Sequence, residues 1–306
     1  MVILGKVRQG YGVPRAAWGH AAMLLFSGLV AGSFALGARS ANLIDPAALN
    51  AVRFVLAAAI LGTLAFATGT IRRRDLAAPW RYLVLAGLFT TYFVLMFEGL
   101  KSAPPVSAAA VFTLTPILSA GFGYLLLRQR VTGRMAFALA LGATGALWVI
   151  FRADLSALMA FDIGRGEAIY FWGCVAHAVY TPMVARLNRG EHPLAFTFGM
   201  LVAGALILAV VGGPAIAATP WTALPPIVWV TILYTGVFAS AATFVLLQFA
   251  TLHLPSAKVM AYTYLTPSWV ILWEASLGGA LPPMLVAVGV ALTVLALLLL
   301  LRSEPG

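Results

Sequence analysis

Long apolar segments follow one another along almost the whole chain, separated by short breaks that carry charge, glycine or proline. Hydrophobic residues make up 62% of the 306 residues, and charged residues make up only 9%. A soluble domain carries about 25% charged residues, so this chain cannot cover a surface that faces water. Its solvent is therefore lipid, and the sequence predicts an all-α integral membrane protein.

Apolar segments of about 20 residues, the length of a membrane-spanning helix, occur ten times. Breaks such as Ile71–Asp75 and Gly212–Pro214 separate them. The first run is longer than the apolar part of a signal peptide, which favours an uncleaved first span. The predicted spans are residues 18–37, 47–68, 82–100, 104–127, 134–151, 166–185, 194–212, 225–248, 257–278 and 283–301.

A Leu-Thr-Pro triplet occurs in the fourth span and again in the ninth, ending at Pro116 and Pro267, 151 positions apart. This distance is about half of the chain, and it indicates two related units, residues 18–151 and 166–301. Each unit holds five spans, which is an odd number, so the second unit enters the membrane from the opposite side. The sequence thus predicts two inverted five-helix repeats, an arrangement in which substrate sites lie near the membrane midplane.

Lys and Arg fall unequally on the two sides of the predicted membrane. Fourteen lie on the side of the termini and four on the other, while Arg53 lies within a span. By the positive-inside rule this bias places both termini in the cytoplasm. The same clustering explains the net charge of +10 without nucleic-acid binding. The fourteen are Lys6, Arg8, Arg15, Arg72, Arg73, Arg74, Arg81, Arg128, Arg130, Arg134, Arg186, Arg189, Lys258 and Arg302; the four are Arg39, Lys101, Arg152 and Arg165.

Two local patterns resemble the drug/metabolite transporter superfamily in its EamA-type branch. Arg53–Ala57 is similar to the Arg-Phe-x-x-Ala pattern of that family, and Gly99–Ala109 is similar to its small-residue turn and Ala-rich helix, which ends here at Pro116. A Gly-Glu-Arg pattern that the family often carries is absent at 128–130 and 278–280. The resemblance implies an exporter of small metabolites in the bacterial inner membrane, most nearly of the YddG type, which exports aromatic amino acids.

His177 is an ionisable residue near the middle of a predicted span. Helical spacing places it on one stripe with Tyr170, Cys174 and Thr181, and Tyr180 lies beside that stripe. Such a stripe is expected to face the protein interior. There His177 either binds substrate or relays a proton in a cavity, or it makes a hydrogen bond between helices.

Three charged residues lie near the outer ends of predicted spans, namely Arg53, Glu98 and Glu274. At one depth they could pair across helices and form an outer gate, or a carboxylate could bind a substrate amine. The alternative, which we favour, is a set of pairs or extended side chains in the headgroup region.

Aromatic residues are frequent on several predicted spans, where they either line a cavity for a flat or apolar solute or pack in the core. The predicted substrate-binding residues are Tyr92, Trp172, His177, Tyr180, Tyr234, Thr263, Tyr264 and Trp269. Pro116 and Pro267 each remove one backbone hydrogen bond from a helix, so they are either paired hinges or fixed bends.

These features favour a transporter that works by alternating access and carries hydrophobic or aromatic amino acids. Exporters of cationic drugs or nucleosides, a membrane-embedded enzyme and a receptor are the alternatives. The four histidines, His20, His177, His192 and His253, are scattered, and no catalytic pattern occurs in the spans. We expect no enzyme activity, no metal and no cofactor, and facilitated diffusion by a monomer whose partners are its small-molecule substrate and the lipid bilayer. The single Cys174 excludes an intrachain disulfide.

Overall fold

The computed structural model describes residues 15–129, 131–160, 162–251, 254, 256–279 and 281–302, and all regular structure in these residues is helical. His253 and the side chain of Lys258, both near the predicted ninth span, lie outside this description. The longer helices are α1 (Arg15–Ser40), α2 (Pro46–Ala67), α3 (Trp80–Gly99), α4 (Pro105–Phe112), α5 (Thr115–Leu127), α6 (Gly133–Ile150), α8 (Arg165–Leu187), α9 (Pro193–Val211), α11 (Pro226–Gly236), α12 (Thr243–Thr251), α14 (Thr266–Ser276) and α15 (Val286–Arg302). The short elements are η1 (Arg73–Leu76), α7 (Leu155–Ala160), α10 (Gly213–Ala218), η2 (Trp221–Ala223), η3 (Val237–Ala242), α13 (Ser256–Ala261) and η4 (Tyr262–Leu265).

Eight helical segments in the described residues are long and apolar enough to cross a membrane, so the chain is a multi-pass membrane protein. They agree with the first eight predicted spans to within about three residues. The ninth predicted span, 257–278, is divided into α13, η4 and α14, and the tenth is represented by α15, which is 17 residues long. The structure therefore supports the helical class and leaves the count of ten spans and their inverted relation as a prediction.

Capping residues and prolines fix several helix starts. The Asp45 carboxylate accepts a hydrogen bond from the backbone N–H of Ala47 at 2.8 Å, and Pro46 follows as the first residue of α2. At α9 the ring of His192 caps the helix and Pro193 begins it. Proline at the first helical position costs no hydrogen bond, because that N–H has no partner within the helix. These residues explain why the spans begin where the apolar runs begin.

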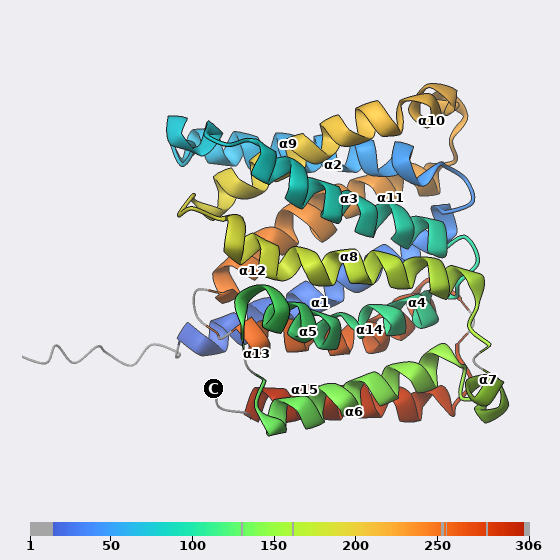
Figure 1. The fold of residues 1–306 in the computed structure, drawn as a ribbon. Coiled ribbons are helices and arrows are strands. Elements are labelled where there is room, and N and C mark those ends of the chain that lie inside the picture. Colours follow the sequence, from blue (N-terminus) through green and yellow to red (C-terminus); the bar gives the residue numbers. More distant parts are fainter. Residues whose placement is uncertain are drawn as a thin grey trace, which may run out of the picture.

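The helices run side by side in a bundle, with α6 and α15 along one edge and α2 and α9 along the opposite edge (Figure 1). Between the edges, α3 packs on α8, and α1 packs on α11, α12 and α14. The helix α4 contacts both α14 and α6. Each of these contacts except that between α4 and α6 joins the first half of the chain to the second, so the halves share one interior.

Both Leu-Thr-Pro triplets lie at interruptions of a helix. After Phe112 the chain makes a turn at Thr113 and Leu114 before α5 begins at Thr115. In the second half, η4 occupies the corresponding place, and α14 begins at Thr266. A third interruption is η3, a stretch of π-helix between α11 and α12. Matching prolines therefore start a new helix in each half, as expected where the ring prevents the preceding hydrogen bond.

Glycines allow two helix pairs to approach backbone to backbone. A Cβ atom added to Gly145 of α6 would lie 2.6 Å from the carbonyl oxygen of Gly289 in α15, and one added to Gly289 would lie 2.7 Å from the carbonyl oxygen of Gly145. Gly99 and Gly166 form a similar mutual contact between the end of α3 and the start of α8. Small residues at such positions let membrane helices gain dispersion contacts that lipid does not offer.

We expect Gly145→Ala to destabilise the protein by about 1–3 kcal/mol, because the added methyl group has to separate α6 from α15. Gly87→Ala is the matched control, since nothing lies within 4 Å of a Cβ atom at Gly87 of α3. There alanine is the better helix former and the change is expected to be neutral or stabilising. Thermal unfolding of the two variants in detergent measures the difference, and equal melting temperatures would contradict this view of the contact.

Candidate substrate cavity

A cavity of about 350 Å³ lies inside the bundle between the two halves of the chain. Its wall is mostly apolar and aromatic, with few polar groups. The lining residues are Met23, Phe26, Val30, Ser33, Arg53, Phe89, Tyr92, Phe93, Met96, Phe112, His177, Tyr180, Thr181, Val184, Ala185, Phe196, Thr197, Ala239, Thr243, Phe244, Leu247, Val259, Met260 and Thr263. These residues come from eight α-helices and from η3 and η4, so the cavity is a property of the assembled bundle.

The cavity is not centred between the two ends of the helices. One end of its lining is formed by Arg53 and Met96, which lie near the connection between α3 and α4 and the start of α2. The other end includes Ala185, an exposed residue in the last turn of α8, and Met260 of α13. The cavity therefore reaches the surface at the end of the bundle that carries the connection between α8 and α9.

Five of the residues selected from the sequence line this cavity, namely Arg53, Tyr92, His177, Tyr180 and Thr263. The ring of His177 lies 4.6 Å from that of Tyr92 and stacks with that of Tyr180 at 5.9 Å, measured between centroids. Tyr92 accepts a hydrogen bond from the hydroxyl of Tyr170 at 3.1 Å. His177 Nδ1 is buried and has no hydrogen-bond partner among the described residues, so it is available to a solute.

Four other predicted aromatic residues lie outside the lining. The side chain of Trp172 is 65% exposed on the outer surface of α8. Tyr234 packs on Gly32 and donates a hydrogen bond to the carbonyl of Leu29, and Tyr264 packs on Gly142.

Trp269 packs on Gly28 and donates a hydrogen bond to Ser27 Oγ at 2.9 Å. Tyr234, Tyr264 and Trp269 thus join helices by filling the space above a glycine, and in this conformation they do not surround the cavity.

In this conformation Arg53, Glu98 and Glu274 do not pair with one another. Glu98 pairs with Lys101 at 2.6 Å, three residues further along the chain. Glu274, in the last turns of α14, pairs with Arg39 at the end of α1 at 2.6 Å. Arg53 contacts polar groups of the second half instead, because η3 packs against α2 at that level.

Several lining residues were not selected from the sequence. Phe112, Phe196 and Phe244 come from three different helices, and Met23 and Phe26 come from α1. Phe89 lies on α3, as does Tyr92. A Phe on an apolar helix gives no local signal of a cavity, since the same pattern serves core packing. Only the fold, which brings these residues to the polar stripe of α8, identifies them as cavity residues.

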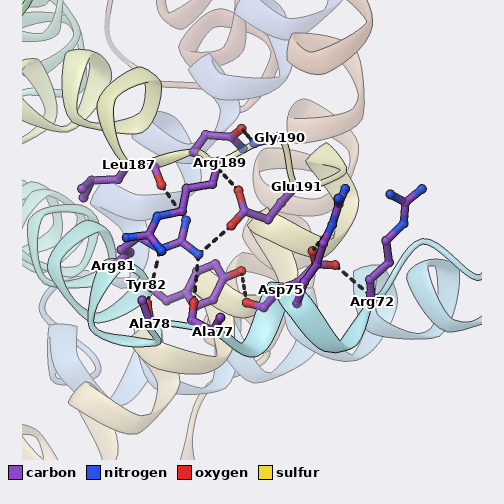
Figure 2. A network of polar contacts seen from close by, with 12 residues as sticks. Arg72, Asp75, Ala77, Ala78, Arg81, Tyr82, Leu187, Arg189, Gly190 and Glu191 are labelled. Carbon is purple, nitrogen blue, oxygen red and sulfur yellow. Dashed lines mark hydrogen bonds and ion pairs between the residues drawn. The ribbon is translucent and has the colours of Figure 1, made fainter.

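A polar network joins the first turn of α3 to the connection between α8 and α9 (Figure 2). The guanidinium of Arg81 pairs with Glu191 at 2.6 Å and donates a hydrogen bond to the carbonyl of Leu187. Tyr82 donates a hydrogen bond to the carbonyl of Asp75. Burial alone would raise the pKa of the Glu191 carboxyl, but the hydrogen bonds from Arg81 and from the backbone N–H of Arg189 lower it below its usual range. This network ties the two halves together beside the end at which the cavity reaches the surface.

Comparison with known proteins identifies the class. The sequence profile of the EamA-like transporter family matches residues 17–151 and again residues 164–302. The chain belongs to this family. This EamA-like transporter is 28% identical over 221 residues to the "Uncharacterized transporter YyaM" of Bacillus subtilis (strain 168), covering 71% of this chain and 72% of that protein. A solved crystal structure covers 93% of this chain and 95% of its own, with 22% identity and a TM-score of 0.67, which supports the fold.

In this EamA-like transporter, Glu191→Gln is expected to cost about 3 kcal/mol of stability, because it leaves the buried charge of Arg81 without its partner. A carboxyl with a lowered folded pKa stabilises the protein above its unfolded pKa, and that contribution is lost as the pH falls through the folded value. The difference in melting temperature between the native protein and Glu191→Gln should therefore be constant from pH 8 to pH 5 and shrink below about pH 4. A difference that disappears already near pH 6 would exclude this ion pair as its source.

Proposed function

We propose that this protein exports small apolar metabolites, most nearly hydrophobic or aromatic amino acids, from the cytoplasm. The observation that carries the proposal is the cavity between the halves, with rings of Phe89, Tyr92, Tyr180 and Phe244 in its wall. Aromatic side chains offer a large apolar surface to a solute and attract an amine to their faces. His177 and the hydroxyls of Thr243 and Thr263 supply hydrogen bonds for polar atoms.

We further propose that spans 1–5 and 6–10 are inverted repeats. The contacts support this, because exchanging helices for their counterparts in the other half reproduces the largest contacts between the halves. The contact of α3 with α8 corresponds to that of α11 with α1, and the contact of α3 with α9 corresponds to that of α11 with α2. The contact of α5 with α8 corresponds to that of α14 with α1, and the pairs α2 with α9 and α6 with α15 are their own counterparts. Such an exchange is expected for any two-fold axis between the halves, and the odd number of predicted spans in each half favours an axis in the membrane plane.

The positive-inside rule assigns the end with the connection between α8 and α9 to the cytoplasm of the bacterial inner membrane, with both termini on that side. The cavity reaches the surface at this end, at Ala185, so the conformation is inward-facing. A solute enters from the cytoplasm and is stopped near Arg53 and Met96. Export then requires the opposite end to open.

The cavity is closed at the end of the bundle opposite Ala185. We propose that Arg39 and Glu274 form the gate at this closed end. Their ion pair joins α1 to α14, and Trp273 adds a hydrogen bond from its indole N–H to the carbonyl of Gly28 at 3.1 Å. The helix breaks before Pro116 and Pro267 lie on the inner side of this closure and are the proposed hinges. Rotation of α14 at its break would separate Glu274 from Arg39 while the wall near α8 closes.

Transport by purified protein in liposomes tests the function. We expect saturable counterflow of phenylalanine, tryptophan and leucine to exceed that of alanine, lysine and glutamate, because the wall offers mainly apolar contact. The recovered solutes should be chemically unchanged, which separates transport from enzyme activity. Faster flux of lysine or of nucleosides than of every apolar amino acid would favour an alternative exporter class.

Two aromatic residues of the same helix provide the matched control for this experiment. Tyr180→Leu removes a ring from the cavity wall and is expected to weaken tryptophan transport about fivefold, with a smaller effect on leucine. Trp172→Leu removes a larger ring from the outer surface of α8 and should leave the selectivity unchanged. Equal effects of the two substitutions would show that α8 supports the fold and does not select the solute.

If Arg39 and Glu274 form the gate, Glu274→Gln should shift the protein towards an outward-facing state, because the substitution removes the ion pair that joins α1 to α14. A cysteine at His177 in a Cys174→Ala background reports the shift. Its labelling by a membrane-impermeant thiol reagent added from outside should increase at least about threefold when Glu274 is replaced. Lys101→Gln is the control, because it breaks only a local pair with Glu98. The same increase in the control would exclude a specific role for Glu274.

A further inference from the structure

Arg53 is a fully buried cation at the closed end of the cavity. Its side chain comes from α2, and its exposed fraction is 0%. Nε donates a hydrogen bond to Ser240 Oγ at 2.9 Å, and one terminal nitrogen donates to the carbonyl of Ala239 at 3.3 Å. Both acceptors belong to η3, whose π-helical turns depart from the regular helix ladder. The phenyl ring of Phe93 lies over the guanidinium, 3.6 Å away.

All of the polar partners of Arg53 among the described residues are neutral. The remaining hydrogen bond joins its other terminal nitrogen to Asn50 Oδ1 at 3.5 Å. Three hydrogen bonds use three of the five guanidinium N–H groups. The partners therefore hold the side chain in place, and its positive charge is not compensated by them.

The acidic residues of the chain lie elsewhere. The sequence has nine Asp and Glu residues, and eight of them, all except Glu304, are within the described residues. None of the eight lines the cavity. Glu98, Glu191 and Glu274 are engaged with Lys101, Arg81 and Arg39. The cavity wall thus carries a positive charge at its closed end and no acidic residue in the described part of the chain.

Because the cavity wall has low polarity, the charge of Arg53 interacts strongly with charged groups along the whole length of a small solute. Coulomb energies rise as the effective dielectric constant falls, and the cavity wall consists mainly of Phe, Met, Val and Ala side chains. A solute with one negative charge neutralises Arg53 on entering. A solute with one positive charge adds a second unpaired cation to the same interior, which is strongly unfavourable.

We propose that Arg53 determines specificity by selecting solutes through a carboxylate, and that the cavity does not require the amine of an amino acid. The solute class is an apolar body with a single carboxylate at the end that faces Arg53. This inference rests on the proposed transport function and deepens it. An amino acid meets the requirement through its carboxylate, while its ammonium group finds no acidic partner in the described wall. The analogue that lacks the amine is therefore the better ligand.

Three compounds with the same phenyl group separate the contribution of the carboxylate from that of the amine. The compound 3-phenylpropanoate has only the carboxylate, phenylalanine has both groups, and 2-phenylethylamine has only the amine. Binding to the purified protein is measured by the ligand-induced shift of its melting temperature. Competition against phenylalanine counterflow is measured at zero membrane potential. We expect 3-phenylpropanoate to act at a concentration at least about tenfold lower than 2-phenylethylamine, and no higher than phenylalanine.

Variants at Arg53 test whether the charge is the cause. Arg53→Lys keeps the charge and should keep the order of the three compounds, whereas Arg53→Gln should reduce the preference for 3-phenylpropanoate over 2-phenylethylamine to less than about twofold. Ser240→Ala removes the hydrogen bond to Nε and keeps the charge, so the preference should persist. The comparison within the native protein needs no variant and holds even if Arg53→Gln does not fold.

The outcomes separate this inference from the transport function. Equal action of 2-phenylethylamine and 3-phenylpropanoate on the native protein would overturn the role of Arg53, while phenylalanine counterflow would still support transport. A preference for the carboxylate that survives in folded Arg53→Gln would also overturn it. A melting-temperature shift with 3-phenylpropanoate in the absence of any amino-acid flux would support the inference and refute the amino-acid part of the proposed function.

Discussion

Lipid offers no hydrogen bonds, so each polar group inside this bundle has to find its partner within the protein. This constraint determines where the helices can be interrupted. The breaks before Pro116 and Pro267 and the π-helical η3 all lie inside the bundle, where neighbouring helices cover them. The carbonyl of Ala239 in η3 shows how the constraint is met, since Arg53 from the other half of the chain donates to it. Interruptions and buried polar side chains therefore occur together, and both occur at the cavity.

The sequence predicted the elements well because span length and turn chemistry are local properties. Asp45–Pro46 and His192–Pro193 start α2 and α9 where the apolar runs start. The inward orientation of the polar stripe of α8 could also be predicted, because a helical face that carries a histidine with Tyr170 and Thr181 is unfavourable in lipid. The structure places His177 and Thr181 in the cavity wall and buries Tyr170 beside them. These features needed no knowledge of the neighbouring helices.

The aromatic residues were harder to assign, because their role depends on what lies opposite. Tyr234 and Tyr264 fill space above Gly32 and Gly142, each more than 100 residues away in sequence. Tyr92 has the same ring on the same kind of helix, but it lies beside His177 and faces the cavity. The partners of the charged residues were equally hard to predict. Glu274 pairs with Arg39 of α1, a helix that is distant in sequence and lies near Glu274 only in the folded protein. Span counts and helical spacing cannot supply these long-range neighbours.

The two helix breaks are equivalent in sequence and different in conformation. In the first half, two residues separate α4 from α5, whereas in the second half the four residues of η4 separate α13 from α14. If two inverted repeats had identical conformations, the cavity between them would be equally open, or equally closed, to both sides of the membrane. A cavity that reaches the surface at one end requires the halves to differ, and the backbone differs at these breaks, beside Phe112 and Thr263 of the cavity wall. Exchange of the two conformations between the halves would move the opening to the other side, which is the change that alternating access requires. The difference between the breaks is therefore the backbone feature that most directly connects the duplicated sequence to the proposed transport cycle.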